Sequence, residues 1–247
     1  MNDTKTKFLV IGSRRQLTKI KIDSLSIRVC STVIQKVSSV RDLGAWFDTS
    51  MTMTTHIGKA CSKGFFGLYK IKQIRKCLSE KATATLIHAF VTSHLDYCNS
   101  LLYVVPMCQI DRLQKVLNAA ARVTRQVPRY KHLTPVLKSL HWLSSGFRIK
   151  FKIALLIFKT LKGMASLYLS RMLQPKPTSR YSLRSNNENL LIIPRTICKT
   201  FGDRAFAVAG PKIWKSLPVH IREAENLHNF KNKLKTHLFK GAFNKEQ

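Results

Sequence analysis

The feature that most constrains the fold is a change of hydrophobic period at Thr54. Before Thr54 apolar and polar residues tend to alternate, and after it apolar residues recur every three or four positions to about residue 173. A period near 3.6 is typical of amphipathic helices. Because the segments are joined by short connections, the sequence predicts a helical bundle.

Four helices are expected in this part of the chain. The first begins at Thr54 or Thr55, and its predicted inner face is Ile57, Ala60, Cys61, Phe65, Leu68 and Ile71. The second is capped by Ser79 and runs through Thr83, Leu86, Ile87, Phe90 and His94. The third ends before Pro128 and buries Ile110, Leu113, Val116, Leu117, Ala120 and Ala121. The fourth, "FRIKFKIALLIFKTLKG", is capped by Gly163.

Residues 1–50 are predicted to form short strands. "KFLVIG" is an apolar run that ends at Gly12, and "LSIRVCSTVIQKV" alternates around a polar turn, which is typical of a hairpin. "VRDLGAWFD" is expected to be one further strand with a bulge or a close backbone approach at Gly44. So few short strands need a cover to bury a core.

The composition and hydrophobic pattern of the sequence change again beyond Leu173. "QPKPTSRYSLRSNNEN" is predicted to be a loop or linker, and "LLIIPRT" an edge strand, because Pro194 cannot donate to a ladder. "FGDRAFAVAGPKIWKSLP" is an apolar segment interrupted at Gly210-Pro211. A last helix turns its apolar residues inward, and these are Leu227, Phe230, Leu234 and Leu238.

Together these patterns predict an α+β fold that is mainly α. Short antiparallel strands at the N terminus are expected to pack on a helical bundle, followed by a small mixed, basic C-terminal domain. The expected domains are 1–50, 51–173 and 174–247.

The charge balance indicates the class of partner. The 247 residues hold 43 Lys and Arg against 12 Asp and Glu, a formal net charge of +31. Such a body repels itself and favours an anionic partner. Nucleic acid fits best, because cationic side chains release the counterions condensed on a polyphosphate. A membrane is not expected as a partner, since no apolar run approaches the roughly 18–20 residues of a spanning helix. No secretory signal is recognised, so an intracellular location is expected.

The basic residues recur on every predicted helix, with few acids four positions away to neutralise them. One basic helix face is usually a solvated surface, but repetition on all helices favours contact with RNA or DNA. The expected contact residues are Lys59, Lys63, Lys70, Arg75, Lys76, Arg112, Lys115, Arg122, Lys231 and Lys235. Stacking of bases on Phe65, Phe66 and Tyr69 is a weaker expectation, because core packing also explains Phe65.

Metal and disulfide sites are not predicted. The six cysteines, Cys30, Cys61, Cys77, Cys98, Cys108 and Cys198, form no CxxC pair. A structural zinc site commonly takes two ligands from one turn, so reduced and mostly buried thiols are expected instead. No cofactor is therefore expected.

The stretch "TSHLDYCNSLLY" resembles a catalytic cluster. If the second helix continues through it, His94 and Cys98 share one face and Asp96 points away. A Cys–His nucleophile needs a third group to orient the histidine, and Asp96 is on the wrong side for that role. Partly buried His94 and Cys98, with Asp96 capping or pairing locally, are expected instead.

Other catalytic constellations are sparse. Asp42 with Asp48 and Glu223 with Glu225 are the closest paired carboxylates, and neither pair is accompanied by a second acidic motif. The ten glycines are scattered and form neither a P-loop nor a GxGxxG motif.

Several ordered motifs carry a family resemblance. "NDTKTKFLVIGS", "SVRDLGAWFDTSMTMTTHI", "LIHAFVTSHLDYCNSLLY" and "RLQKVLNAAARVTR" are followed by "LTPVLKSLHWL", "RYSLRS", "FGDRAF" and "PKIWKSLPVHIR". In this order they resemble the C-terminal part of a non-LTR (LINE-type) retrotransposon reverse transcriptase of the jockey and chicken-repeat-like clade. The resemblance covers essentially the whole chain.

The resemblance implies a role for each segment. Residues 1–50 would be the end of the polymerase palm with a primer-grip-like hairpin at "DLGAWFD", and residues 51–173 a thumb that holds a template–primer duplex by its backbone. Lys5, Leu43 and Gly44 would lie near the nucleotide and primer. Lys7 stands where the family usually has a glutamate.

The resemblance also implies that this chain is not a polymerase by itself. The family's catalytic Ala-Asp-Asp turn occurs nowhere in the sequence, and without such carboxylates two Mg²⁺ ions cannot be held for nucleotidyl transfer. Mg²⁺ is expected only for a complete parent enzyme. A truncated fragment with residual RNA or DNA binding is therefore expected. An inert, poorly folded remnant and a basic interaction protein without a nucleic-acid role remain the alternatives.

Overall fold

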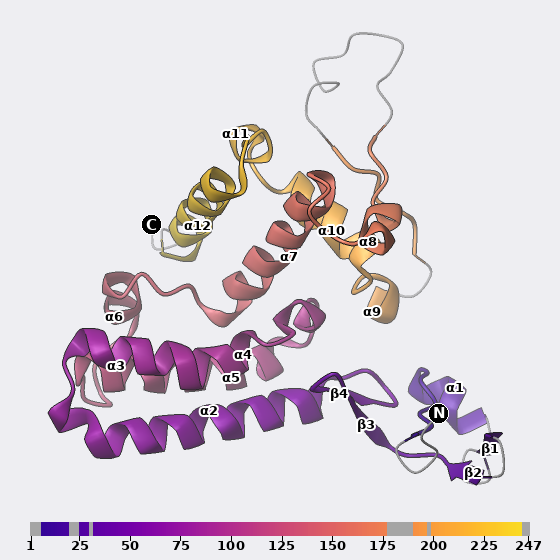
Figure 1. The fold of residues 1–247 in the computed structure, drawn as a ribbon, viewed down its shortest axis with the longest axis horizontal. Helices are drawn as coiled ribbons and strands as arrows, with labels where there is room; N and C mark the ends of the chain where they lie inside the picture. The colour runs from indigo at the N-terminus through magenta and orange to yellow at the C-terminus, as the bar shows by residue number, and fades with distance from the viewer. Residues whose placement is uncertain (1–5, 20–24, 30–31, 177–189, 197–198, 244–247) are drawn as a thin grey trace, which may run out of the picture. The chain divides into compact units, whose positions relative to one another are not determined.

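The computed structural model describes residues 6–19, 25–29, 32–176, 190–196 and 199–243 (Figure 1). They belong to two compact units, Met1–Lys63 and Gly64–Gln247, and each is described by itself. The described residues are mostly helical, with two short antiparallel strand pairs near the N terminus. This confirms the predicted class, α+β and mainly α.

The first unit contains both strand pairs. Strands β1 (Ser26–Val29) and β2 (Thr32–Gln35) form the hairpin predicted from "LSIRVCSTVIQKV". The predicted strand "KFLVIG" is wrong: within it Phe8 makes only an isolated bridge, to Lys36, and the short helix α1 (Arg14–Lys19) follows. An apolar run alone does not make a strand, because a strand also needs a partner along its length.

The segment "VRDLGAWFD" is a hairpin and not the single bulged strand predicted from its residues. Strand β3 (Ser39–Asp42) turns back into β4 (Ala45–Asp48), and Asp42 pairs with Ala45. The turn residues Leu43 and Gly44 have φ values of 44° and 88°. Two successive positive φ values are typical of a two-residue hairpin turn, because they match the twist of the strands. Glycine adopts a positive φ without steric strain.

Asp48 connects this hairpin to helix α2 (Thr54–Ile74). Its carboxylate accepts hydrogen bonds from the backbone N–H groups of Ser50, Thr52 and Met53, at 2.8–3.1 Å. In the strand register Asp42 and Asp48 lie at opposite ends of the hairpin. The arrangement therefore gives Asp48 a structural task and does not bring the two carboxylates together.

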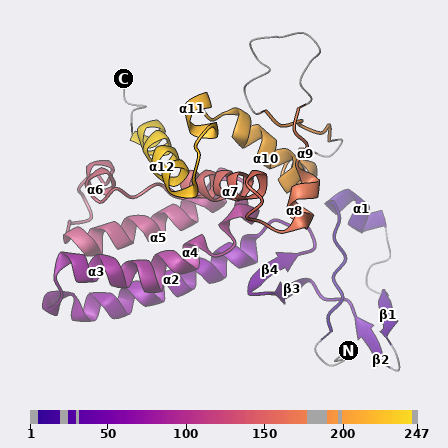
Figure 2. The same ribbon diagram turned by 45° about the horizontal axis from the view of Figure 1, so that its top comes forward.

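The second unit begins with three long helical segments that lie side by side (Figure 2). They are the second half of α2, the segment from α3 (Glu80–Ile87) to α4 (Ser93–Asp96), and α5 (Met107–Arg125). A 3₁₀ turn, Arg75–Cys77, ends α2. Ser79 caps α3 as predicted, since its hydroxyl accepts from the N–H of Ala82.

The predicted inner faces are mostly confirmed. All six residues expected inside α5 are buried: Ile110, Leu113, Val116, Leu117, Ala120 and Ala121. On α2 the expected residues are buried except Phe65, which is 48% exposed. The prediction for Phe65 is therefore wrong, and its ring lies on a surface described below.

A π-helical turn, His88–Thr92, separates α3 from α4. A π-helical turn contains one residue more than an α-helical turn. The residues after it are therefore rotated by about 100° about the helix axis, relative to a continuous α-helix. Phe90 is accordingly 56% exposed, although the uninterrupted helix that was predicted would place it inward. Gly67 of α2 lies against this turn, where a Cβ would be 2.7 Å from the carbonyl oxygen of Phe90.

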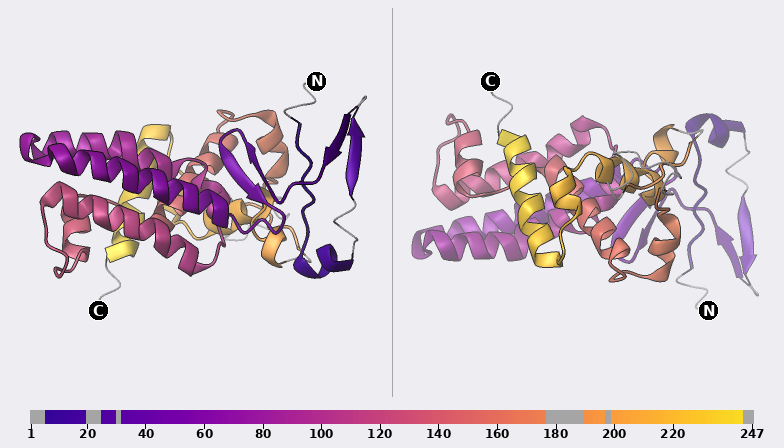
Figure 3. Two further views of the ribbon diagram at one scale, coloured as in Figure 1. Left: turned by 90° about the horizontal axis from the view of Figure 1, so that it is seen from below. Right: turned by 90° about the horizontal axis from the view of Figure 1, so that it is seen from above.

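The core of the remaining helices forms around α7 (Ser145–Leu161), against which α10 (Phe206–Lys215) and α12 (Leu227–Phe243) pack (Figure 3). The rings of Phe158 and Phe230 stack at 4.2 Å, and Trp214 lies 5.9 Å from Phe230. Residues 174–247 thus contribute helices to the same core as α7. The short helices here are η5 (Asn99–Leu102), α6 (Thr134–Ser139), α8 (Leu167–Met172), α9 (Lys199–Gly202) and α11 (Val219–Arg222).

Gly210-Pro211 does not interrupt the apolar segment, contrary to the prediction. Helix α10 runs through Pro211, and both residues are buried. A Cβ on Gly210 would lie 3.5 Å from Ile157 of α7, so the small residue permits close packing. The helix forgoes one hydrogen bond at the proline, and we infer that burial against α7 offsets this loss.

Two smaller predictions in this unit have different outcomes. Gly163 ends α7 with φ of 69°, and Met164 donates its N–H to the carbonyl of Lys159 at 2.7 Å, which confirms the predicted glycine stop. Within "LLIIPRT" the described residues contain only an isolated bridge between Leu191 and Pro175, and no strand.

Candidate nucleic-acid interface

A groove of about 560 Å³ runs between α2 and the C-terminal end of α5 in the second unit. Its cationic lining residues are Lys72, Arg75, Lys76, Arg122 and Arg129. No carboxylate belongs to the described lining of this α2–α5 groove. An opening of one charge sign with a low-dielectric wall raises the local concentration of counterions.

Aromatic rings accompany these cations. Phe65, Tyr69 and Lys72 line the groove from α2, and Lys76 lines it from the 3₁₀ turn that follows. Their spacings of four, three and four residues form one stripe. Tyr69 is 59% exposed. Phe66 is also exposed, and the ammonium of Lys70 lies 5.6 Å from its ring.

Arg75 lines the groove and is hydrogen-bonded to backbone carbonyls. Its guanidinium donates to the carbonyls of Val123, Thr124 and Leu78 at 2.7–2.9 Å. The carbonyls at the C-terminal end of a helix lack partners within that helix. Arg75 supplies partners for the end of α5, so the structure gives this predicted contact residue a structural task.

Arg122 is used in a similar way. Its guanidinium donates to the carbonyls of Pro128 and Lys131, beyond the left-handed residue Gln126 that ends α5. The charges of both arginines still contribute to the potential of the groove. Lys72, Lys76 and Arg129 are the cations of the groove whose side chains have no protein partner among the described residues.

The other predicted contact residues are dispersed. Lys59 and Lys63 are exposed on the part of α2 that belongs to the first unit, where Lys59 lies 5.8 Å from the ring of Trp46. Lys115 is exposed on α5, and Arg112 donates to the side chain of Gln109.

The resemblance places Lys5, Leu43 and Gly44 near the nucleotide and primer. Leu43 and Gly44 form the turn of the β3–β4 hairpin, with the Leu43 side chain 87% exposed. Lys5 lies outside the described residues.

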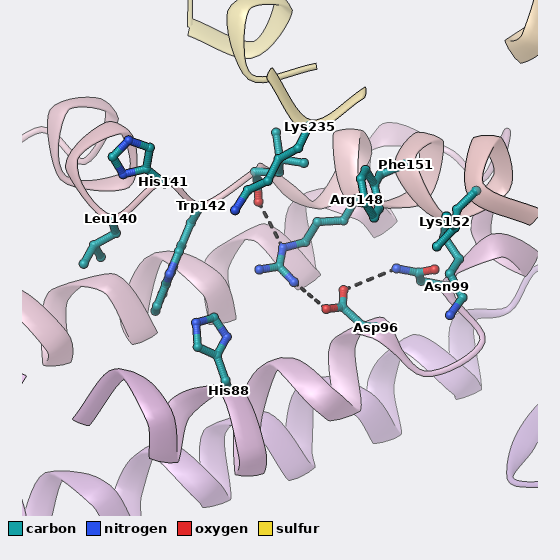
Figure 4. A pocket seen from close by; sticks show the side chains of 12 residues that line it. His88, Asp96, Asn99, Leu140, His141, Trp142, Arg148, Phe151, Lys152 and Lys235 are labelled. Atoms are coloured by element: carbon teal, nitrogen blue, oxygen red, sulfur yellow. Dashed lines mark hydrogen bonds and ion pairs between the residues drawn. The ribbon is translucent and has the colours of Figure 1, made fainter. Parts of the chain in front are cut away.

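A second basic site is a cavity of about 450 Å³ between α7, α12 and the segment 88–99 (Figure 4). Its ionisable lining residues are His88, Asp96, His141, Arg148, Lys152 and Lys235. Lys235, one of the predicted contact residues, therefore faces this α7–α12 cavity, while Lys231 is exposed one turn earlier on α12.

Within the cavity Asp96 is held from two sides. It forms an ion pair with Arg148, and Asn99 donates to its other oxygen at 3.3 Å. The Nε of Arg148 donates to the carbonyl of Leu143 at 3.1 Å. Asn99 is 4% exposed, and the Oδ1 atom of its side-chain amide is buried without a hydrogen-bond partner in the described residues.

The pKa of His88 is lowered from its ordinary 6.5, first by burial and then by the positive charges of Arg148 and Lys235, which outweigh the opposing carboxylate of Asp96. A field that disfavours a further positive charge is one that favours an anion.

The stretch "TSHLDYCNSLLY" does not form a catalytic cluster. Helix α4 ends at Asp96, Tyr97 is extended, and Cys98 is left-handed with φ of 53°. The helix therefore does not continue to Cys98 as supposed, although His94 and Cys98 are partly buried as expected. Asp96 pairs with Arg148, fifty-two residues away, and not only locally.

The described cysteines form no disulfide, and fewer of them are buried than predicted. Cys61 is buried, Cys98 is intermediate, and Cys77 and Cys108 are exposed. Cys30 and Cys198 lie outside the described residues. In the described part of the chain no three His, Cys, Asp or Glu side chains gather into a group suited to a metal ion. None of the helices described is both long and apolar enough to cross a membrane.

Sequence reasoning missed part of both sites. Lys72 and Arg129 line the groove but are not among the contact residues expected from the sequence. The four–three–four spacing of Phe65, Tyr69, Lys72 and Lys76 is a signal that could have found the stripe. Arg148 and Trp142 carry no such signal, because their partners come from distant segments.

Comparisons with protein-family models, curated proteins and solved structures found no match to this chain.

Proposed function

We propose that this protein binds RNA or DNA through backbone phosphates, without reading base sequence. The observation that carries the proposal is the α2–α5 groove, whose described lining has five cations and no carboxylate. The formal net charge of +31 supports it, because such a chain associates with polyanions. Lysines make point-charge contacts to phosphates and carry no base preference.

The groove also suggests which form of nucleic acid is bound. A stripe of two exposed rings followed by two lysines suits a strand whose bases can stack on Tyr69 and Phe65. A duplex hides its bases, so it would use the cations alone. We therefore expect single strands to bind more tightly than duplexes of the same length.

We further propose that the chain derives from a non-LTR retrotransposon reverse transcriptase, corresponding to its palm end, thumb and C-terminal region. The order of the family-like motifs supports this origin, as do a β-hairpin at "DLGAWFD" and a basic helical region after it. The absence of the Ala-Asp-Asp motif from the sequence argues against polymerase activity of this chain.

The salt dependence of binding tests the phosphate contacts. The triple variant Lys72→Gln, Lys76→Gln and Arg129→Gln removes three groove cations without inverting any charge. If each contacts one phosphate, the slope of log K against log salt should become shallower by about 2 for single strands. Fluorescence anisotropy with a labelled oligonucleotide between 50 and 200 mM salt measures this slope.

A matched control separates the groove from overall charge. Lys138→Gln, Lys215→Gln and Lys240→Gln remove the same charge from exposed lysines that do not line the groove. The control should keep the wild-type slope. Equal slopes for the two triple variants would refute the groove as the binding surface.

Tyr69→Ala tests the stacking contribution. It should weaken single-strand binding by about 1–3 kcal/mol and leave duplex binding nearly unchanged, because only unpaired bases offer a face to the ring. An equal loss for both forms would mean that Tyr69 only shapes the groove.

A further inference from the structure

The α7–α12 cavity is lined by more cationic side chains than carboxylates. Arg148 and Lys152 line it from α7, and Lys235 lines it from α12. Asp96 is the single carboxylate of the described lining, and Arg148 and Asn99 already hold it. This leaves a net positive space with an opening to solvent.

The guanidinium of Arg148 is oriented by two hydrogen bonds. Its Nε donates to the carbonyl of Leu143, and one terminal nitrogen pairs with Asp96. The other terminal nitrogen has no hydrogen bond within the described residues. An arginine that is already oriented loses little freedom when it takes a further acceptor, which favours binding.

The other polar groups face the same space. In the view of Figure 4, Lys235 lies above the guanidinium of Arg148 and His88 below it. The Nδ1 atom of His88 lies 3.2 Å from the hydroxyl of Thr92, whose proton is directed to the His88 carbonyl. We therefore assign the ring proton to Nδ1, which leaves Nε2 to gain a proton when an anion approaches.

The walls of the cavity are apolar beside this charged part. Trp142, Phe151 and Leu155 belong to the lining, and the ring of Trp142 meets His88 edge-on at 5.3 Å. A volume of about 450 Å³ exceeds that needed by a single inorganic ion and lies in the range of small-molecule sites. A compact anionic group attached to a larger, partly apolar body suits this combination.

We propose that the α7–α12 cavity binds a phosphate monoester, with the phosphate between Arg148, Lys235 and His88 and the ester body against Trp142 and Phe151. A phosphate monoester carries close to two negative charges and three acceptor oxygens, which matches several converging donors. The proposal is independent of nucleic-acid binding in the groove, because the two sites share no lining residue.

Isothermal titration calorimetry of the full chain with adenosine monophosphate, inorganic phosphate and adenosine tests the site. Adenosine monophosphate should bind saturably with one site per chain, and adenosine should not. If inorganic phosphate binds as tightly as the nucleotide, the cavity recognises the phosphate alone. If the nucleotide binds more tightly, its body also contacts the apolar wall. The second result supports the proposal, and the first would overturn it, because the ester body would then gain nothing from Trp142 and Phe151.

Neighbouring lysines of α12 provide a matched pair of variants. Lys235→Gln should weaken binding of adenosine monophosphate roughly tenfold or more, as expected for a lost charge-assisted hydrogen bond. Lys231→Gln removes the same charge one turn away, outside the cavity, and should bind like the wild type. Lys152→Gln gives a second test from α7 should Lys235→Gln disturb the fold.

Two further results would overturn the proposal. One is the absence of saturable binding by either phosphate compound, and the other is an equal loss of affinity in Lys235→Gln and Lys231→Gln. Oligonucleotide binding by the same variants separates this result from the function of the groove. Failure of one site predicts nothing about the other, because their cations differ.

Discussion

Replacing Gly67 by alanine tests the contact between α2 and the π-helical turn His88–Thr92. A Cβ at this position would lie 2.7 Å from the carbonyl oxygen of Phe90 and 3.4 Å from a methyl group of Val91. The first distance is shorter than carbon and oxygen atoms tolerate. Because that oxygen belongs to the backbone, the turn or α2 has to move.

The expected magnitude follows from two opposing effects. Overpacking at a tightly packed contact costs about 1–3 kcal/mol. Alanine in place of glycine inside a helix contributes about 1 kcal/mol in the other direction. Gly67→Ala should therefore destabilise the protein by up to about 2 kcal/mol. For about 180 residues in the second unit, this lowers its melting temperature by several degrees.

Gly146→Ala is the matched control. Gly146 lies in the first turn of α7, and a Cβ there would meet nothing within 4 Å. The helix preference then acts alone, so this variant should be unchanged or stabilised by up to about 1 kcal/mol. Thermal melts followed by circular dichroism at 222 nm compare the two variants with the wild type.

The difference in melting temperature between Gly67→Ala and Gly146→Ala tests the close contact at Gly67. If Gly67→Ala melts as high as Gly146→Ala, α2 does not approach the turn as closely as described. Hydrogen exchange gives a second measure, since faster exchange in segment 88–92 of Gly67→Ala would locate the strain at the turn.

Four further predictions concern other features. Arg75→Gln should destabilise the second unit by about 2–3 kcal/mol through lost carbonyl contacts at the end of α5, whereas the exposed neighbour in Lys76→Gln should cost less than about 0.5 kcal/mol in denaturant melts. Stability should fall as the pH drops below about 6.5, because the lowered pKa of His88 means that the unfolded chain binds more protons there, and His88→Gln should reduce this loss in melts from pH 8 to pH 5. Cys98→Ser should cost on the order of 1 kcal/mol and leave oligonucleotide binding intact, and a complete loss of binding with the fold retained would contradict this. Purified protein should extend no primer with Mg²⁺ or Mn²⁺, and incorporation that survives stringent purification would contradict the proposed loss of polymerase activity.

The helices were predictable where burial follows a regular period. The inner face of α5 repeats apolar residues without interruption, and a continuous α-helix puts them all on one side. The π-helical turn was not predictable in this way, because no residue in "HAFVT" marks it. It depends on the contact with Gly67, which comes from a separate helix.

The hairpin β3–β4 shows a different limit. Its turn, Leu43-Gly44, contains one glycine, while the pair that most strongly signals such a turn is Asn-Gly or Asp-Gly. A single glycine within an apolar segment is equally typical of a bulge. The family resemblance pointed to a hairpin here where the periodicity did not.

The candidate sites were predictable in charge but not in the role of each residue. Basic helix faces are visible in the sequence, and Lys72 and Lys76 lie on one of them. The partners of Arg75, however, are backbone carbonyls forty-eight and forty-nine residues further along the chain. Only the packing of α5 beside α2 shows that this guanidinium is occupied.

The π-helical turn has a consequence for how the gene can change. Such a turn holds one residue more than the same length of α-helix, so deleting a single codon within His88–Thr92 would restore regular winding and keep the reading frame. Everything from Ser93 to the end of α4 would then rotate by about 100°. Asp96 would leave Arg148, and the α7–α12 cavity would lose its carboxylate in one mutational step.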